Sequence, residues 1–167
     1  MRILALIVAT LLLVGTLGLG LLGANRGIKD AKDIDGIYGA AKTEIAAAAK
    51  AGDKTAIEMK SLGESTGRLR IGGALMAVTG VLALVLLVLT YLSKPVVKVF
   101  AGGVIASAAL AVVISPQYDL GPLAPASARS LAYVLAVMAI LGAGAAFGAQ
   151  AVKAKRAGAM RPAYQQG

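Results

Sequence analysis

The chain has no cysteine, no histidine and no tryptophan among its 167 residues. Without cysteine, a disulfide framework is excluded. Haem, iron–sulfur and zinc sites are normally held by histidine or cysteine, so we expect no cofactor bound through this chain. Nucleophilic catalysis by a Cys–His or Ser–His pair is excluded by the same absence. We therefore expect no catalytic residues and interpret the chain as non-enzymatic.

Charge is also scarce. Only 15% of the residues are charged and 58% are hydrophobic, with a mean hydropathy of +0.79, whereas soluble domains carry about 25% charged residues. Four apolar runs are long enough to cross a bilayer, which takes about 20 residues in a helix. These runs are 3–23, 71–92, 96–115 and 131–152. The pattern predicts an all-α, polytopic membrane protein whose residues 1–167 form a single membrane domain with four transmembrane helices.

The first run also has to be compared with a secretory signal peptide. Its apolar stretch, 3–23, is longer than the roughly 7–15 residues of a signal peptide, and no A-x-A cleavage site follows it. We therefore expect it to be a transmembrane helix.

No aspartate or glutamate lies inside any of the four runs. Proton- or cation-coupled transport normally needs a carboxylate within the membrane, so a small coupled exporter is disfavoured. Lys98 lies near the end of its run and can extend to the interface. The hydroxyls of Thr10, Thr79, Ser107 and Tyr133 can line a polar path or contact a quinone. Hydroxyls in helix bundles more often bond to neighbouring helices, and we favour that interpretation.

Basic residues without any acid gather at one side of the predicted membrane domain. With four crossings, the N-terminus, the turn at 93–94 and the tail 153–167 share this side. The positive-inside rule then places both termini in the cytoplasm of a bacterial inner membrane and the insert 24–70 outside it. The two sides carry similar numbers of Lys and Arg, but the bases of the tail lie directly at a membrane end. This side carries Arg2, Lys94, Lys98, Lys153, Lys155, Arg156 and Arg161.

The net charge of +9 raises the question of a nucleic-acid partner. The bases flank apolar runs and form no stripe interleaved with aromatics, so we expect no nucleic-acid binding. We expect the tail 153–167 to be a flexible basic segment. Its residues Lys153, Lys155 and Arg156 are predicted to contact the anionic headgroups of the bilayer.

The polar insert 24–70 has the pattern of a helical hairpin. Its apolar residues recur at steps of three or four, Gly52 provides a stop, and Asp53 can cap a second helix over 54–62. The apolar face of the first helix can lie on the membrane, fold against its short partner or dock on another protein. Its small side chains favour docking. The face consists of Ile34, Ile37, Tyr38, Ala41 and Ile45, and it continues with Ala48 and Ala49.

The stretch KDAKDIDG, which ends at Gly36, holds three aspartates. An EF-hand loop would also need acidic ligands at its first and twelfth positions. Aligned on Gly36, these positions are Ala31 and Lys42. We therefore favour the alternative that Asp33 or Asp35 caps the amphipathic helix of the insert, and we expect no metal site.

Small residues recur at one-turn spacing in the third and fourth runs, and such ridges let helices approach closely in lipid. The alternative is that they reflect composition alone, because glycine and alanine are common in membrane helices. We expect the third and fourth helices to face protein and the first two to be more lipid-facing. The predicted interface residues are Gly102, Gly103, Ser107, Ala132, Ala136, Gly144 and Gly148.

These features favour a non-catalytic accessory or scaffold subunit of a larger inner-membrane complex, with other integral membrane subunits as partners. A respiratory or photosynthetic complex is a plausible host, although no residue specifies one. The first alternative is a homo-oligomeric channel built around the glycine-rich helices. A membrane enzyme is disfavoured because no acid–base or metal constellation is visible.

Overall fold

The computed structural model describes residues 2–116 and 128–159, and the side chains up to residue 153. This part of the chain is all-helical. Four of its helices are long and apolar enough to cross a membrane, which indicates a multi-pass membrane protein. The helices are α1 (Arg2–Lys50), α2 (Lys54–Glu64), α3 (Thr66–Tyr91), α4 (Val97–Ile114) and α5 (Ala128–Ala159).

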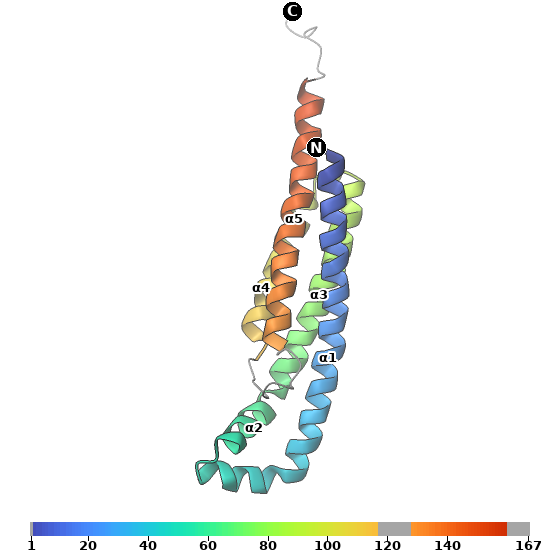
Figure 1. Ribbon diagram of the computed structural model, residues 1–167. Helices are drawn as coiled ribbons and strands as arrows, with labels where there is room; N and C mark the ends of the chain where they lie inside the picture. The colour runs from blue at the N-terminus through green and yellow to red at the C-terminus, as the bar shows by residue number, and fades with distance from the viewer. Residues whose placement is uncertain (1, 117–127, 160–167) are drawn as a thin grey trace, which may run out of the picture.

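The four long helices form an elongated antiparallel bundle, and α2 lies beside its lower end (Figure 1). Going around the bundle, α1 packs on α3, α3 on α4, α4 on α5, and α5 returns to α1. At the upper end, Arg2 donates to Ser93 Oγ (3.4 Å) and Gln150 Nε2 donates to the Lys94 carbonyl (2.7 Å). The start of α1, the α3–α4 turn and the later part of α5 therefore meet at one end.

Helix α1 is much longer than its apolar run. Its 49 residues correspond to about 74 Å of helix, more than twice the roughly 30 Å hydrocarbon thickness of a bilayer. The predicted run 3–23 covers only its first half. The polar second half continues past the bundle, and Figure 1 shows its last turns bending away from the axis. The bend coincides with Ala41, whose φ of −113° and ψ of 17° are not helical.

The closest helix contact joins α1 to α3 through glycine. A Cβ added to Gly20 would lie 2.5 Å from the Met76 carbonyl oxygen, and one added to Gly27 would lie 2.9 Å from that of Leu69. From the other side, a Cβ on Gly80 would lie 3.2 Å from Leu17 Cα. The two backbones therefore touch over two turns or more, an approach that only small residues permit.

This contact corrects one expectation from the sequence. The second apolar run, now α3, is not mainly lipid-facing, because 44% of its apolar window is buried, the largest share of the four spans. Helix α1 is the most exposed span, with 22% buried. The leucine-rich composition of α3 does not distinguish its buried side from its exposed side. Leu86 is buried in the core, whereas Val88 is 50% exposed.

The turn between α1 and α2 follows the prediction. Gly52 has a φ of +88°, which an L side chain rarely adopts, and it ends the helix as expected. Asp53 caps α2 by accepting from the backbone N–H groups of Thr55 (2.9 Å) and Ala56 (3.3 Å). Both predictions are confirmed. The helix extends two residues beyond the expected 54–62, to Glu64.

The predicted cap at Asp33 or Asp35 is wrong. Both residues lie inside α1, which runs unbroken from the membrane segment into the insert, so no new helix begins there. The chain between Gly23 and Gly52 contains no proline, and Gly27 fits closely against Leu69 rather than interrupting the helix. Asp35 instead forms an ion pair with Arg70 at 2.5 Å.

Candidate functional site

Most polar groups inside the bundle are bonded to one another or to backbone, whereas the buried Ser115 Oγ has no hydrogen-bond partner among the described residues. Thr79 Oγ1 lies 2.8 Å from the Leu75 carbonyl and 2.9 Å from Ser107 Oγ, and Ser107 Oγ donates to the Val104 carbonyl. These hydroxyls link α3 to α4. The arrangement is that of a satisfied hydroxyl pair in a bundle rather than a nucleophile with its base.

Acidic side chains do not converge in the described part of the chain. No group of three or more Asp, Glu, His or Cys side chains there is placed to hold a metal ion. Asp33 is exposed, and Asp35 is engaged with Arg70.

Some of the predicted interface residues pack within the chain. Ser107 and Ala132 are buried in the bundle, and Ala136 is half-buried against its core. A Cβ on Gly103 would make only an ordinary contact, 3.8 Å from Leu82 Cδ1 of α3. The structure therefore places these residues at contacts between α4, α5 and their neighbours in the same chain.

Three other predicted residues are open to the outside. A Cβ added to Gly102, Gly144 or Gly148 would meet no atom of the described part of the chain within 4 Å. Gly102 and Gly144 are exposed, and Gly148 is half-buried. We call these three residues the open glycine face.

The open glycine face has residues on two helices that pack on each other, α4 and α5. Lys98, one turn before Gly102 on α4, places its Nζ 5.6 Å from the centroid of the Phe147 ring on α5. Phe147 lies beside Gly148 in sequence and one turn from Gly144. Because Lys98 and Phe147 meet across the two helices, Gly102 and Gly144 each lie one turn from a contact between α4 and α5.

The predicted docking face of the insert is partly occupied by the chain itself. A Cβ on Gly63 at the end of α2 would overlap the Tyr38 ring, so Tyr38 lies flat against this glycine. Ile34, Ala41 and Ile45 are half-buried, whereas Ile37 is 54% exposed. The structure therefore brings part of this face against α2.

The basic tail lies only partly within the described residues. Lys153 is exposed on α5. Lys155 and Arg156 belong to the same helix, but their side chains lie outside the described part.

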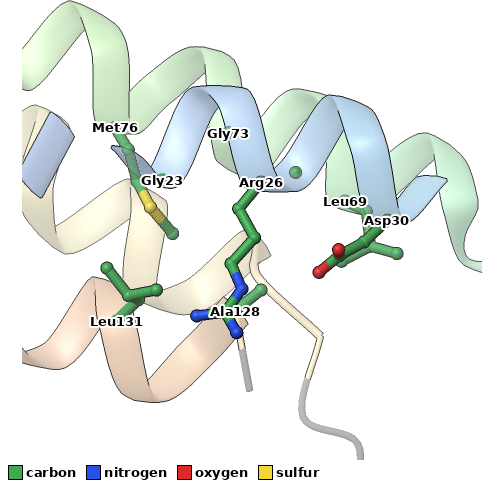
Figure 2. Close-up of a pocket in the computed structure, with 9 residues that line it drawn as sticks. Gly23, Arg26, Asp30, Leu69, Gly73, Met76, Ala128 and Leu131 are labelled. Atoms are coloured by element: carbon green, nitrogen blue, oxygen red, sulfur yellow. The ribbon is translucent and has the colours of Figure 1, made fainter. Parts of the chain in front are cut away.

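A small pocket with a cavity volume of about 10 Å³ opens where α1, α3 and the start of α5 meet (Figure 2). Figure 2 shows Arg26 extending from α1 toward Ala128, with Asp30 farther along α1. The pocket was not predicted from the sequence. The only sequence feature that relates to it is the spacing of glycines on the facing helices α1 and α3, which leaves room between them. Small-molecule sites usually span about 300–1,000 Å³, whereas this cavity has room for about one water molecule, so its volume does not indicate a ligand. The lining residues are Gly23, Arg26, Gly27, Asp30, Leu69, Gly73, Met76, Ala128 and Leu131.

Comparison with known proteins gives no family assignment. No family model, no curated protein and no solved structure matches the chain.

Proposed function

We propose that the protein is a non-catalytic accessory subunit of a larger membrane complex and docks on another integral membrane subunit through the open glycine face. One observation carries this proposal. The four long helices already close on one another, yet no described residue comes within 4 Å of a Cβ added at Gly102, Gly144 or Gly148.

A transmembrane helix is the partner that best suits this face. In lipid, association depends on close packing, and glycine lets a neighbouring backbone approach where a larger residue would hold it away. The α1–α3 contact at Gly20 and Gly80 is an example of such packing within this chain. The open glycine face offers a second helix the same opportunity.

The alternative of a homo-oligomeric channel has less support. The residues that fill the bundle axis are large and apolar, including Leu13, Met76, Leu86 and Leu135, which are at most 1% exposed. A pore would therefore have to form between copies. The open glycine face itself offers no charged or hydroxyl group to line it.

We further propose that both termini face the cytoplasm of a bacterial inner membrane. Support comes from the end of the bundle where Arg2, Lys94 and Gln150 meet, because the charged residues nearby are all basic. The acidic residues of the insert lie toward the opposite end, with α2 and the second half of α1.

A pair of glycine variants tests the docking proposal. Gly148→Leu fills the open glycine face, and Gly18→Leu fills an equally open position on α1, where no atom lies within 4 Å of the added Cβ. We expect both variants to fold. The wild type and Gly18→Leu should be found in an assembly larger than the 16.7 kDa chain, and Gly148→Leu should be released from it. The measurement is native mass spectrometry of the detergent-extracted assembly.

Two outcomes would contradict the proposal. Retention of Gly148→Leu at the same stoichiometry as Gly18→Leu would show that the face does not dock a partner. An assembly made only of identical copies of this chain would favour the channel instead.

A further inference from the structure

The projecting end of the molecule contains two breaks in helical structure that lie side by side. Ala41, within α1, has a φ of −113° and a ψ of 17°, and Ser65, between α2 and α3, has a φ of −102° and a ψ of 7°. Both conformations are close to the sparsely populated bridge region rather than the α-helix. Tyr38, three residues before Ala41, lies against Gly63, two residues before Ser65, so the two breaks are at the same level.

The segment between the two breaks, residues 42–64, holds its own shape. We call this segment the tip, and Figure 1 shows it at the lower end of the molecule. Ala56 and Leu62 of α2 are buried. The Asp53 N–H donates to the Ala48 carbonyl (3.1 Å), and the Asp53 side chain caps α2. These contacts are internal to the tip, so they do not depend on its angle to the bundle.

The parts of α1 and α3 on the other side of the breaks are joined to each other. Gly27 of α1 fits closely against the Leu69 carbonyl of α3. Asp35 of α1 pairs with Arg70 of α3 at 2.5 Å. We call this part of α1, beyond its apolar run and before Ala41, together with the first turns of α3, the base. Because the base is tied across two helices, its position follows that of the bundle.

The contacts between tip and base lie close to the line that joins the two breaks. The Tyr38 ring lies on Gly63, which has no side chain to interlock with it. Thr66 Oγ1 donates to the Gly63 carbonyl (3.2 Å), a local bond that spans the break at Ser65. Helix α2 packs mainly on α1 and has little contact with α3. A rotation of the tip about this line therefore changes few of the contacts that hold it.

Glycine adds backbone freedom to α1 next to its break. Gly36 and Gly39 are exposed, and a Cβ added to either would meet no atom of the described part of the chain within 4 Å. Neither glycine is therefore required by close packing. Glycine adopts non-helical conformations more readily than other residues, and helix bends often occur at glycine. Since Gly39 lies two residues before Ala41, the helix is easiest to bend between these two positions.

We propose that the tip swings as a rigid unit about an axis through Ala41 and Ser65, with the Tyr38 ring on Gly63 as the pivot. Such hinges consist of a few residues at the ends of elements that absorb the change in φ and ψ. The device lets the projecting end change its angle while the membrane helices stay in place. Two adjacent helix breaks between a self-contained tip and a fixed base carry the inference. It goes beyond the docking function and does not depend on it.

The experiment measures distances between two spin labels on the full chain in phosphatidylcholine nanodiscs. The chain has no cysteine, so introduced cysteines carry all the labels. The pair Lys29→Cys and Lys54→Cys crosses the hinge, since both positions are exposed, one on the base and one at the far end of the tip. The control pair, Lys29→Cys and Val137→Cys, joins the base to an exposed position on α5. Double electron–electron resonance should give a broad or double distribution for the crossing pair and a narrow one for the control.

Two alanine variants locate the bend. Gly39→Ala should lower the share of swung conformations about fivefold, because glycine leaves the helical conformation more easily than alanine by about this factor. Gly36→Ala is the matched control, since it is equally open but farther from Ala41, and it should leave the distribution unchanged. Hydrogen exchange at the Ile57 amide, which donates to the Asp53 carbonyl, should stay slow because the tip moves without unfolding.

Each contrary outcome has a distinct meaning. A crossing pair as narrow as the control pair would show that the tip is fixed and would overturn the hinge. Equal effects of Gly39→Ala and Gly36→Ala would spread the bending along α1, and fast exchange at Ile57 would assign it to unfolding of the tip; either result would also overturn the proposal. Gly148→Leu should leave the distances unchanged, so a failure of the docking proposal can be distinguished from a failure of this one.

Discussion

Glycine residues in this chain occupy two different environments. Gly20 and Gly80 lie where the α1 and α3 backbones touch, whereas Gly18 and Gly144 have open space where a side chain would be. All four lie inside helices, where glycine is less favourable than alanine by roughly 0.5–1 kcal/mol. Only at the first two does the close approach of another backbone explain why glycine is required.

Alanine substitution should distinguish the two environments. In Gly20→Ala the new methyl group would lie 2.5 Å from the Met76 carbonyl oxygen, so we expect a loss of about 1–3 kcal/mol from overpacking. In Gly18→Ala the methyl group is free, and we expect a neutral or slightly stabilising change, up to about 1 kcal/mol. Thermal unfolding in one detergent measures both. Equal melting temperatures for Gly20→Ala and Gly18→Ala would show that the α1 and α3 backbones have room for a methyl group between them.

The Asp35–Arg70 ion pair should contribute little to stability. The two side chains are 41% and 59% exposed, and exposed pairs typically contribute about 0.2–1 kcal/mol. We therefore expect Asp35→Asn to lower the free energy of unfolding by less than about 1 kcal/mol, and the loss to shrink at high salt. The control is Asp33→Asn, at an exposed aspartate two residues before Asp35. A calcium-dependent melting shift abolished by both changes would instead revive the metal site.

At the scale of elements, the start of α2 depends on a capping residue, Asp53, that directly precedes the helix in the sequence. Asp53 accepts two backbone hydrogen bonds at the start of the helix. Asp53→Ala should therefore destabilise α2 by about 0.5–2 kcal/mol, whereas Asp53→Asn should preserve it because asparagine also caps well. Hydrogen exchange at the Ile57 amide, which donates to the Asp53 carbonyl, reports the opening of this turn. Equal exchange in the two variants would contradict a capping role.

Features of the fold that depend on residues close together in the sequence were predictable, whereas features that depend on distant contacts were not. The four apolar runs and the Gly52–Asp53 turn depend on neighbouring residues, and the sequence predicted them. The continuity of α1 did not follow from its sequence, because Asp33 and Asp35 are good caps in isolation. Whether the helix begins there or runs through depends on its packing against Leu69 and on Arg70, which is 35 residues away from Asp35.

The candidate site shows the same division. One-turn spacing identified the small residues of α4 and α5, but it could not separate Ser107, which faces Thr79 of α3, from Gly102, which faces outward. That distinction depends on which side of each helix its neighbours cover. The ring of Phe147 under Lys98 was also not predicted, because the two residues are brought together only by the packing of α4 on α5.

At the scale of the whole molecule, the four-helix part and the projecting part differ in charge. Ala128 at the start of α5 lies near Gly73 of α3, since both line the same pocket. The part of the chain from this level outward comprises the second half of α1, the α1–α2 turn, α2 and the first turns of α3. It carries all the acidic residues of the described chain. The opposite end is basic. A membrane with an anionic cytoplasmic leaflet would favour one orientation of such a molecule.

This asymmetry leads to a topology prediction that the absence of cysteine makes simple to test. A single cysteine is introduced at Ser61, which is exposed on α2, or at Ala163 in the tail. We expect an impermeant thiol reagent added to intact cells to label Ser61→Cys and to leave Ala163→Cys unlabelled until the membrane is opened, because the acid-free basic residues share the side of the tail.

The same labelling can measure what determines the orientation. Replacing Lys94 and Lys153 with glutamine should weaken the preference for a cytoplasmic tail, whereas adding acidic residues on that side should change it little, since lysine and arginine near membrane ends determine orientation. Labelling of Ala163→Cys in intact cells would contradict this orientation and would place the tail outside the cell.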